Sequence, residues 1–183
     1  MNHYGGSRRM RANADTCVVV VFGVTGSGKS RIGAALAKSL RWTFYDADDF
    51  HGQKNRGKLR RGIPLTDRDR WPWLNRLRRV INRCLAERHS MILACSALKR
   101  IYRRHLRIDD RVLFVYLKVE PAVVERRLQR RKGHFMNADL LQSQFTTLEE
   151  PTNGAIVADA AQKPREIVNS LRRRLISADI ARM

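Results

Sequence analysis

The sequence predicts an α/β fold in which a parallel sheet of about five strands carries helices on both faces. From residue 17 onward, short apolar runs alternate with amphipathic stretches, which is typical of strand–helix units around a buried parallel sheet. The chain has 183 residues, of which 43% are hydrophobic, and this is the size and composition of one globular domain. We therefore expect a flexible tail over residues 1–15 and a single domain over residues 16–183.

The expected strands are short runs rich in β-branched, aromatic and other apolar residues. They lie at residues 17–22, 43–46, 91–95, 112–117 and 155–158. Between these runs, apolar residues recur at helical spacing. The clearest helices are expected at residues 29–40, 73–88 and from 164 to about 176, and Pro121 suits the first turn of another. Right-handed crossovers through such helices bring parallel strands side by side in one sheet.

Basic residues dominate the charge, with 37 Lys and Arg against 17 Asp and Glu and a net charge of +20. Such a charge attracts nucleic acid, acidic membrane surfaces and small anionic substrates alike. The basic residues are scattered through helical patterns, which is typical of solvated helix faces. Aromatic residues make up only 7%, no nucleic-acid-binding signature occurs, and no apolar run approaches the roughly 20 residues of a membrane helix. We expect a small-molecule substrate, and neither a specific nucleic acid nor a membrane as partner.

The three cysteines, Cys17, Cys84 and Cys95, lie in apolar stretches without metal-ligand spacing. An odd number in such places supports neither a disulfide framework nor a zinc site, so a reducing compartment is expected and the cytoplasm is the default. Residues 181–183 read Ala-Arg-Met, which resembles a permissive form of the peroxisomal targeting tripeptide. A peroxisome-like organelle is therefore the alternative.

The most specific motif is residues 23–30, Gly-Val-Thr-Gly-Ser-Gly-Lys-Ser, between an expected strand and an expected helix. This pattern is a phosphate-binding loop, whose glycines let backbone N–H groups point at phosphate oxygens. Lys29 supplies positive charge to the β and γ phosphates, and the Ser30 hydroxyl can bind Mg²⁺. The loop predicts a bound ATP or GTP. Its expected nucleotide-binding residues are Gly23, Thr25, Gly26, Ser27, Gly28, Lys29, Ser30 and Arg31.

A second cluster, residues 46–51, follows the second expected strand at the edge where open α/β sheets bind ligands. Alternation along an extended segment places Asp46 and Asp48 on one side, so one can serve a metal shell while the other reaches a substrate hydroxyl. The alternative is a solvated acidic turn that caps the next helix, which suits Asp49 best. For His51, a structural role and a substrate contact are both open.

Eight segments of the chain resemble gluconate kinases, a family of phosphate-loop small-metabolite kinases, and the resemblance covers about residues 18–151. These segments are residues 23–30, 46–51, 62–74, 94–99, 102–103, 114–118, 131–135 and 144–151. Segments 94–99 and 131–135 are more specific for the family than the loop itself. The sequence departs from the family at Arg31, usually a small residue, and at Gly52, commonly proline. Neither departure removes a chemical group.

The resemblance implies a P-loop kinase fold with a mobile lid near residues 125–140. It also implies transfer of a phosphoryl group from ATP, with Mg²⁺, to the 6-hydroxyl of D-gluconate, and the family is often homodimeric. Asp48 is then the candidate to orient or deprotonate the hydroxyl, and Asp46 belongs to the outer shell of the metal.

Gluconate also needs a cation for its carboxylate. Lys99 and Arg103 are one helical turn apart just after an expected strand, and are the candidates for this role. Arg70 is a further candidate substrate contact, and Ser96 either caps a helix or touches substrate.

Residues 125–133 look like the start of the family's lid. Arg127 and Arg131, one helical turn apart, are expected to neutralise the transferring γ-phosphoryl group, with Arg127 also binding nucleotide. Arg126 and Arg130 lie around the helix from them and are expected in solvent, the alternative being that all four decorate a basic helix. For His134, a hinge and a substrate contact are both open.

Two other functions remain as alternatives. One is phosphorylation of shikimate or another small metabolite, since the loop and paired aspartates are shared more widely, although segments 94–99 and 131–135 argue against it. The other is nucleic-acid binding on a nucleotide-binding fold, suggested by the net charge of +20 alone.

Overall fold

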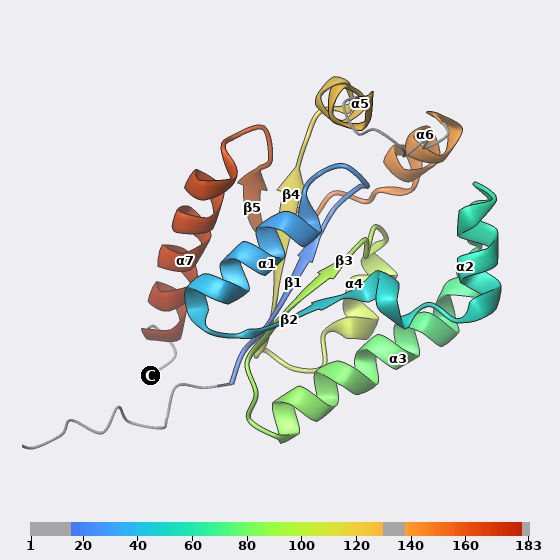
Figure 1. Cartoon of the computed structure of the whole chain (residues 1–183). Coiled ribbons are helices and arrows are strands. Elements are labelled where there is room, and N and C mark those ends of the chain that lie inside the picture. The colour runs from blue at the N-terminus through green and yellow to red at the C-terminus, as the bar shows by residue number, and fades with distance from the viewer. Residues whose placement is uncertain (1–15, 130–137, 181–183) are drawn as a thin grey trace, which may run out of the picture.

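The computed structural model, which describes residues 16–129 and 138–180, contains a parallel sheet with helices on both faces (Figure 1). The strands are β1 (Val18–Phe22), β2 (Thr43–Asp46), β3 (Met91–Cys95), β4 (Val112–Lys118) and β5 (Ile156–Asp159). Their order in the sheet is β2-β3-β1-β4-β5, and every neighbouring pair is parallel. The fold class and the five expected strands are confirmed.

Strand β1 lies at the centre of the sheet because all five of its residues are apolar and fully buried. Val18 pairs with Met91 on one side and with Val112 on the other. Successive side chains point to opposite faces, so Val19 joins the core on one side of the sheet and Val20 the core on the other.

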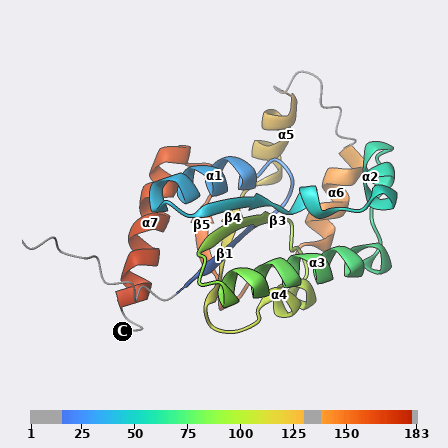
Figure 2. The same cartoon turned by 60° about the horizontal axis from the view of Figure 1, so that its bottom comes forward.

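The helices are α1 (Lys29–Leu40), α2 (Gln53–Arg60), α3 (Asp67–Ala86), α4 (Arg100–Leu106), α5 (Pro121–Gln129), α6 (Ala138–Thr147) and α7 (Pro164–Ile180), with a 3₁₀ turn, η1, at Ala47–Phe50. Helices α1 and α7 cover one face of the sheet, with Ile32 and Leu171 in one apolar cluster. Helices α3 and α4 cover the other face, with Leu77 and Leu106 in a second cluster (Figure 2). Helices α5 and α6 lie beyond the end to which β4 points (Figure 1).

Helix α3 begins at Asp67, so the expected start at residue 73 is wrong. The Thr66 hydroxyl accepts a hydrogen bond from the Asp69 amide at 3.2 Å, and the Asp69 carboxylate accepts one from the Thr66 amide at 3.0 Å. This reciprocal capping box satisfies two amides of the first turn and extends the helix upstream. Pro72 lies inside the helix.

Smaller boundaries also differ from the expectations. Strand β5 is shifted by one residue, β1 begins at Val18, α3 ends at Ala86, and α7 runs to Ile180. The expected lid falls on α5, on α6 and on residues 130–137, which lie outside the described residues, as do the tail over residues 1–15 and the tripeptide at 181–183.

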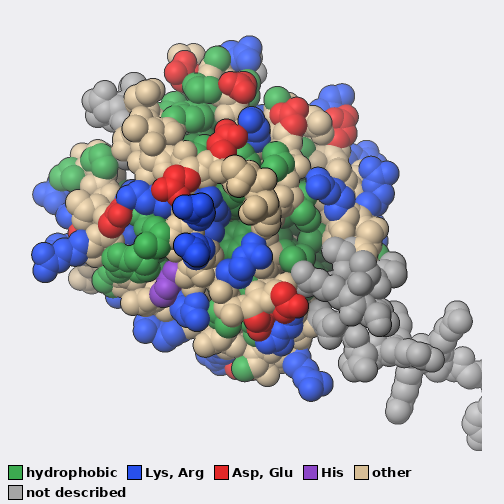
Figure 3. Space-filling model, turned by 180° about the vertical axis from the view of Figure 1, so that it is seen from behind, with side chains coloured by type: hydrophobic (Ala, Val, Ile, Leu, Met, Phe, Trp, Pro, Cys, Tyr) green, Lys and Arg blue, Asp and Glu red, His purple; other side chains and the backbone are tan. Residues whose placement is uncertain are grey.

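No helix within residues 16–129 and 138–180 is long and apolar enough to cross a membrane. On the face shown in Figure 3, Lys and Arg side chains are interspersed with acidic and hydrophobic ones and do not form one continuous patch. This arrangement is typical of solvated helix faces.

Candidate active site

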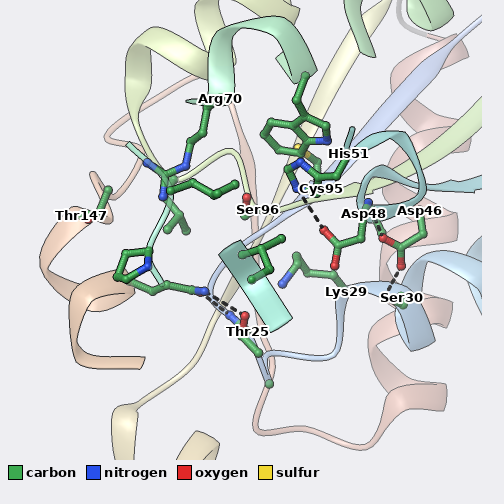
Figure 4. A pocket seen from close by; sticks show the side chains of 18 of the residues that line it. Thr25, Lys29, Ser30, Asp46, Asp48, His51, Arg70, Cys95, Ser96 and Thr147 are labelled. Atoms are coloured by element: carbon green, nitrogen blue, oxygen red, sulfur yellow. Dashed lines mark hydrogen bonds and ion pairs between the residues drawn. The ribbon is translucent and has the colours of Figure 1, made fainter. Parts of the chain in front are cut away.

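A pocket of about 390 Å³ opens at the carboxyl end of the sheet (Figure 4). It is built by the loop before α1, the turn after β2, the start of α3, the end of β3 and the last turns of α6. The expected site residues that line it are Thr25, Gly26, Gly28, Lys29, Ser30, Arg31, Asp46, Asp48, His51, Arg70 and Ser96. Residues remote in sequence thus meet in one cavity, as parallel topology requires.

The loop of residues 23–30 has the backbone shape of a phosphate cradle. Gly26 and Gly28 have φ angles of 77° and 99°, which other residues rarely adopt. A Cβ atom at Gly26 would lie 2.6 Å from Cγ1 of Val124, so only glycine fits between the loop and α5. The loop leads into the N-terminus of α1 at Lys29, and a helix N-terminus favours an anion through its backbone N–H groups and its dipole. This geometry fits the phosphates of a nucleotide.

Ser30 and Asp46 lie together at one side of the pocket. The Ser30 hydroxyl donates to Oδ2 of Asp46 at 2.5 Å, and Oδ1 of Asp46 accepts from the Asp48 amide at 3.1 Å. Hard oxygen ligands of this kind fit Mg²⁺, which takes one or two carboxylates and completes its shell with water and phosphate. The described residues hold no group of three or more His, Cys, Asp or Glu that could bind a metal alone.

The Asp48 side chain projects into the hollow of the pocket. The surrounding walls partly desolvate it, and this raises the pKa of its carboxyl above the ordinary value, as does the charge of Asp46, while Lys29 acts in the opposite direction. Asp48 can therefore accept a proton more readily than an ordinary aspartate. Asp49 does not line the pocket.

His51 both packs and faces the pocket. Its ring stacks on Trp73 with centroids 4.5 Å apart, and Nε2 lies 3.9 Å from Oδ1 of Asp48. Burial, and after it the charges of the neighbouring cations Arg56, Arg70 and Arg76, together lower the pKa of His51 to about 4. The ring is therefore neutral at physiological pH, so its contact with Asp48 is not an ion pair.

Arg70 is the cation at the end of the pocket away from Ser30 and Asp46 (Figure 4). Its Nη1 atom donates to the Tyr102 hydroxyl at 3.4 Å and lies 3.7 Å from Oδ1 of Asp67. These contacts hold the guanidinium beside the cavity and leave its other N–H groups for a ligand.

Lys99 and Arg103 do not line the pocket. Lys99 precedes α4 and pairs with Asp67 at 2.7 Å. Arg103 is buried, and its guanidinium donates to the carbonyls of Ala97, Leu98 and Glu149 at 2.9, 2.6 and 2.7 Å. The structure therefore gives both cations partners within the protein.

Of the lid arginines, Arg127 points inward from α5, and its guanidinium donates to the carbonyls of Ala160 at 2.6 Å and Gly26 at 3.5 Å. Arg126 is exposed, and its hydrogen bond among the described residues is to the Ala122 carbonyl of its own helix. Arg130, Arg131 and His134 lie outside the described residues. Arg127 is thus next to the phosphate loop but not in the lining of the pocket.

The structure adds residues that the sequence analysis did not assign. Ser143, Gln144 and Thr147 of α6 line the pocket, together with Leu59, Leu65 and Trp73. Gln144 is the first residue of segment 144–151, one of the segments that resemble gluconate kinases. That resemblance was the signal in the sequence that could have indicated it. Leu59 and Leu65 lie outside any predicted helix, so periodicity could not indicate them.

Three features define a P-loop kinase of small metabolites. They are the phosphate-binding loop after the central strand, the Ser30–Asp46 pair beside the end of that loop, and the sheet order β2-β3-β1-β4-β5. The family model described as shikimate kinase matches residues 25–175. The chain is also 46% identical to a probable gluconokinase of Mus musculus over 153 residues, which are 74% of this chain and 83% of that protein.

Solved structures give the same result. A gluconokinase from Sinorhizobium meliloti 1021 is 41% identical, with a TM-score of 0.78 and coverage of 92% of this chain and 93% of that one. A sugar kinase from Janibacter sp. HTCC2649 is 43% identical, with a TM-score of 0.82 and coverage of 90% and 97%. This chain belongs to the gluconokinase family.

Proposed function

We propose that this protein transfers the γ-phosphoryl group of ATP to the 6-hydroxyl of D-gluconate, giving 6-phosphogluconate and ADP. The observation that carries the proposal is that one pocket has a phosphate loop with Asp46 and Asp48 at one end and Arg70 at the other (Figure 4). Gluconate has a carboxylate at one end, which can pair with Arg70, and a terminal hydroxyl at the other end, which can reach Asp48. Membership of the gluconokinase family supports the same substrate.

The loop binds the donor. Its backbone N–H groups hold the phosphates, and Lys29 neutralises charge on the β and γ phosphates. Ser30 would bind Mg²⁺ with Asp46 in the outer shell of the metal, and the ion would supply charge neutralisation at the phosphates. We keep Arg127 and Arg131 as the candidates for a further contribution of positive charge from the lid.

The acceptor lies between Asp48 and Arg70. Asp48 accepts a hydrogen bond from the 6-hydroxyl, orients the attacking oxygen and takes its proton as the phosphorus–oxygen bond forms. Arg70 pairs with the carboxylate and is held in place by Tyr102. His51, Ser96 and His134 are kept as candidate hydroxyl contacts, and the structure favours packing as one role of His51.

The proposal is tested by ADP release from Mg-ATP in the presence of single acceptors. D-Gluconate is expected to support turnover, whereas shikimate and nucleoside monophosphates are not. Equal turnover with shikimate would mean that Arg70 and Asp48 do not select a sugar acid, and the proposed function would fall.

Two expectations outside the pocket, the compartment and the oligomeric state, belong to the same proposal. The chain acts in the cytoplasm, or in a peroxisome-like organelle if residues 181–183 are read as a targeting signal. Fluorescence microscopy of the chain with and without those residues distinguishes the two. The homodimer implied by the resemblance is tested by light scattering.

A further inference from the structure

The first residue of the segment 144–151 contacts the phosphate loop directly. The backbone N–H of Thr25 donates to Oε1 of Gln144 at 2.7 Å, and Nε2 of Gln144 donates to the hydroxyl oxygen of Thr25 at 3.0 Å (Figure 4). These residues are 119 positions apart, and both are half-buried. One amide group thus spans the backbone and the side chain of a single threonine, which fixes the χ1 angle of Thr25.

The direction of these hydrogen bonds determines what the Thr25 hydroxyl can still do. A hydroxyl has one proton to donate and two lone pairs. Gln144 donates to one lone pair, so it cannot receive the hydroxyl proton at the same atom. No group within residues 16–129 and 138–180 accepts that proton. Because Thr25 lines the pocket together with Lys29, the proton is available to a ligand there.

We propose that Thr25 donates its hydroxyl proton to an oxygen of the γ-phosphoryl group, and that Gln144 is the positioning residue that turns the hydroxyl toward it. The inference deepens the proposed function and rests on it. A hydrogen bond to a phosphate oxygen is charge-assisted, and it strengthens wherever negative charge collects during transfer. This role is separate from that of Lys29, which acts as a point charge.

The other end of the same segment explains how Gln144 keeps its place. The Glu149 amide donates to the Leu98 carbonyl at 3.1 Å, and Arg103 donates to the Glu149 carbonyl at 2.7 Å. Leu98 lines the pocket, and the next residue, Lys99, pairs with Asp67, which also contacts Arg70 at the proposed acceptor side. Helix α6 is therefore anchored to the acceptor side of the pocket at its end and to the donor side through Gln144.

The first test measures binding without turnover. We use wild type, Thr25→Val, Gln144→Met and the matched control Gln142→Met, which alters an exposed glutamine of the same helix. The probes are Mg-ADP and the Mg complex of the β,γ-imido analogue of ATP. In Thr25→Val and Gln144→Met, we expect the dissociation constant of the imido analogue to rise about tenfold, because one charge-assisted hydrogen bond is lost. The dissociation constant of ADP is expected to stay unchanged.

Gln142→Met is expected to match the wild type for both nucleotides. Equal weakening of ADP and the imido analogue in Thr25→Val would overturn the inference, because the hydroxyl would then not act on the γ-phosphate. So would a Gln144→Met variant that matches Gln142→Met. Thermal unfolding checks the fold of each variant. If Gln144→Met does not fold, Thr25→Val decides alone, since it leaves Gln144 in place.

The second test separates a positioning role from a merely structural one. On gluconate, kcat is expected to fall about tenfold or more in Thr25→Val and in Gln144→Met, while KM for gluconate stays within about twofold. The double variant should be no slower than Gln144→Met, and Thr25→Ser should lose less than Thr25→Val. Additive losses, or a rise in KM in place of the fall in kcat, contradict the inference.

The two proposals fail in different ways. If the wild type releases no ADP with gluconate, the proposed function falls, and the ratio of imido-analogue to ADP affinity still decides the role of Thr25 and Gln144. If gluconate is phosphorylated but the ratio is unaltered in both variants, the inference falls and the proposed function stands.

Discussion

Asp46 and Asp48 are two residues apart, but their surroundings differ. Asp46 is bonded to Ser30 and to the Asp48 amide, whereas the Asp48 side chain is open to the pocket. We predict that Asp46→Asn raises the Mg²⁺ concentration for half-maximal rate several-fold, because it weakens the metal shell. Asp48→Asn should lower kcat by about a hundredfold, because the attacking hydroxyl loses its acceptor. Rates measured across a Mg²⁺ titration check both.

Added Mg²⁺ should recover part of the activity of Asp46→Asn and none of that of Asp48→Asn. ATP binding should persist in Asp48→Asn. The division of roles is wrong if Asp48→Asn is the variant that the metal rescues, or if both respond to Mg²⁺ alike.

His51 provides a prediction about pH and stability. Its pKa is lowered to about 4 in the fold, so the unfolded chain binds a proton at higher pH than the folded chain does. The free energy of unfolding therefore falls as pH decreases from about 6.5 to about 4, by up to about 3 kcal/mol from this group. Denaturant unfolding of wild type and His51→Asn at several pH values measures it.

The quantity to compare is the slope of the free energy of unfolding against pH. Absolute stabilities are not comparable, because His51→Asn also loses the stacking on Trp73 and is expected to be less stable at every pH. The variant should show a shallower decline between pH 6.5 and 4. Parallel curves would mean that the histidine titrates equally in the folded and unfolded chain.

Single residues also show where sequence reasoning ends. The phosphate loop, Asp46 and Asp48 could be predicted because their chemistry is carried by local motifs at strand ends. Arg103 could not be assigned from spacing, because its partners are carbonyls that a turn exposes. Ala97 has a φ angle of 37°, and this turn directs the Ala97 and Leu98 carbonyls to the guanidinium.

At the scale of elements, the strands were predictable because a parallel sheet buried on both faces requires continuous apolar runs. Helix α2 was not predictable from the sequence, because Asn55 is its one buried residue and its apolar residues show no helical periodicity. The first turns of α3 depend on a capping box and contain Pro72, so hydrophobic spacing indicates only the later part. Helix α2 and the first turns of α3, which the sequence analysis did not predict, therefore lie beside the pocket and not over the hydrophobic core.

Helix α5 supports a prediction about its two neighbouring arginines. Arg127 bonds to the Gly26 and Ala160 carbonyls, whereas Arg126 is exposed. Arg127→Ala is expected to lower kcat about tenfold or more, because charge beside the phosphate loop is lost, and Arg126→Ala should stay within about twofold. Comparable losses in both variants would indicate a general electrostatic effect of a basic helix.

At the scale of the whole molecule, the pocket joins segments from both sides of the central strand β1. The proposed donor end is formed by the loop after β1, and the proposed acceptor end by α3 and the end of β3. The segment of α6 and the residues after it contacts both ends. On the face shown in Figure 3, the basic side chains are interspersed with acidic and hydrophobic ones and do not define the site. Ligands at the two ends of the pocket should therefore stabilise the same folded unit. A substitution at one end should abolish binding of one ligand and leave binding of the other intact.

We predict that saturating Mg-ADP and gluconate each raise the unfolding temperature. A ligand at about 100 times its dissociation constant adds about 2.7 kcal/mol, which corresponds to about 5–10 °C for a domain of this size. Arg70→Ala should abolish the shift by gluconate and keep the shift by Mg-ADP, because it removes the partner of the carboxylate alone. Arg68→Ala, an exposed arginine of the same helix, is the control and should keep both shifts. Differential scanning fluorimetry measures all of them, and a gluconate shift that survives in Arg70→Ala would place the carboxylate elsewhere in the pocket.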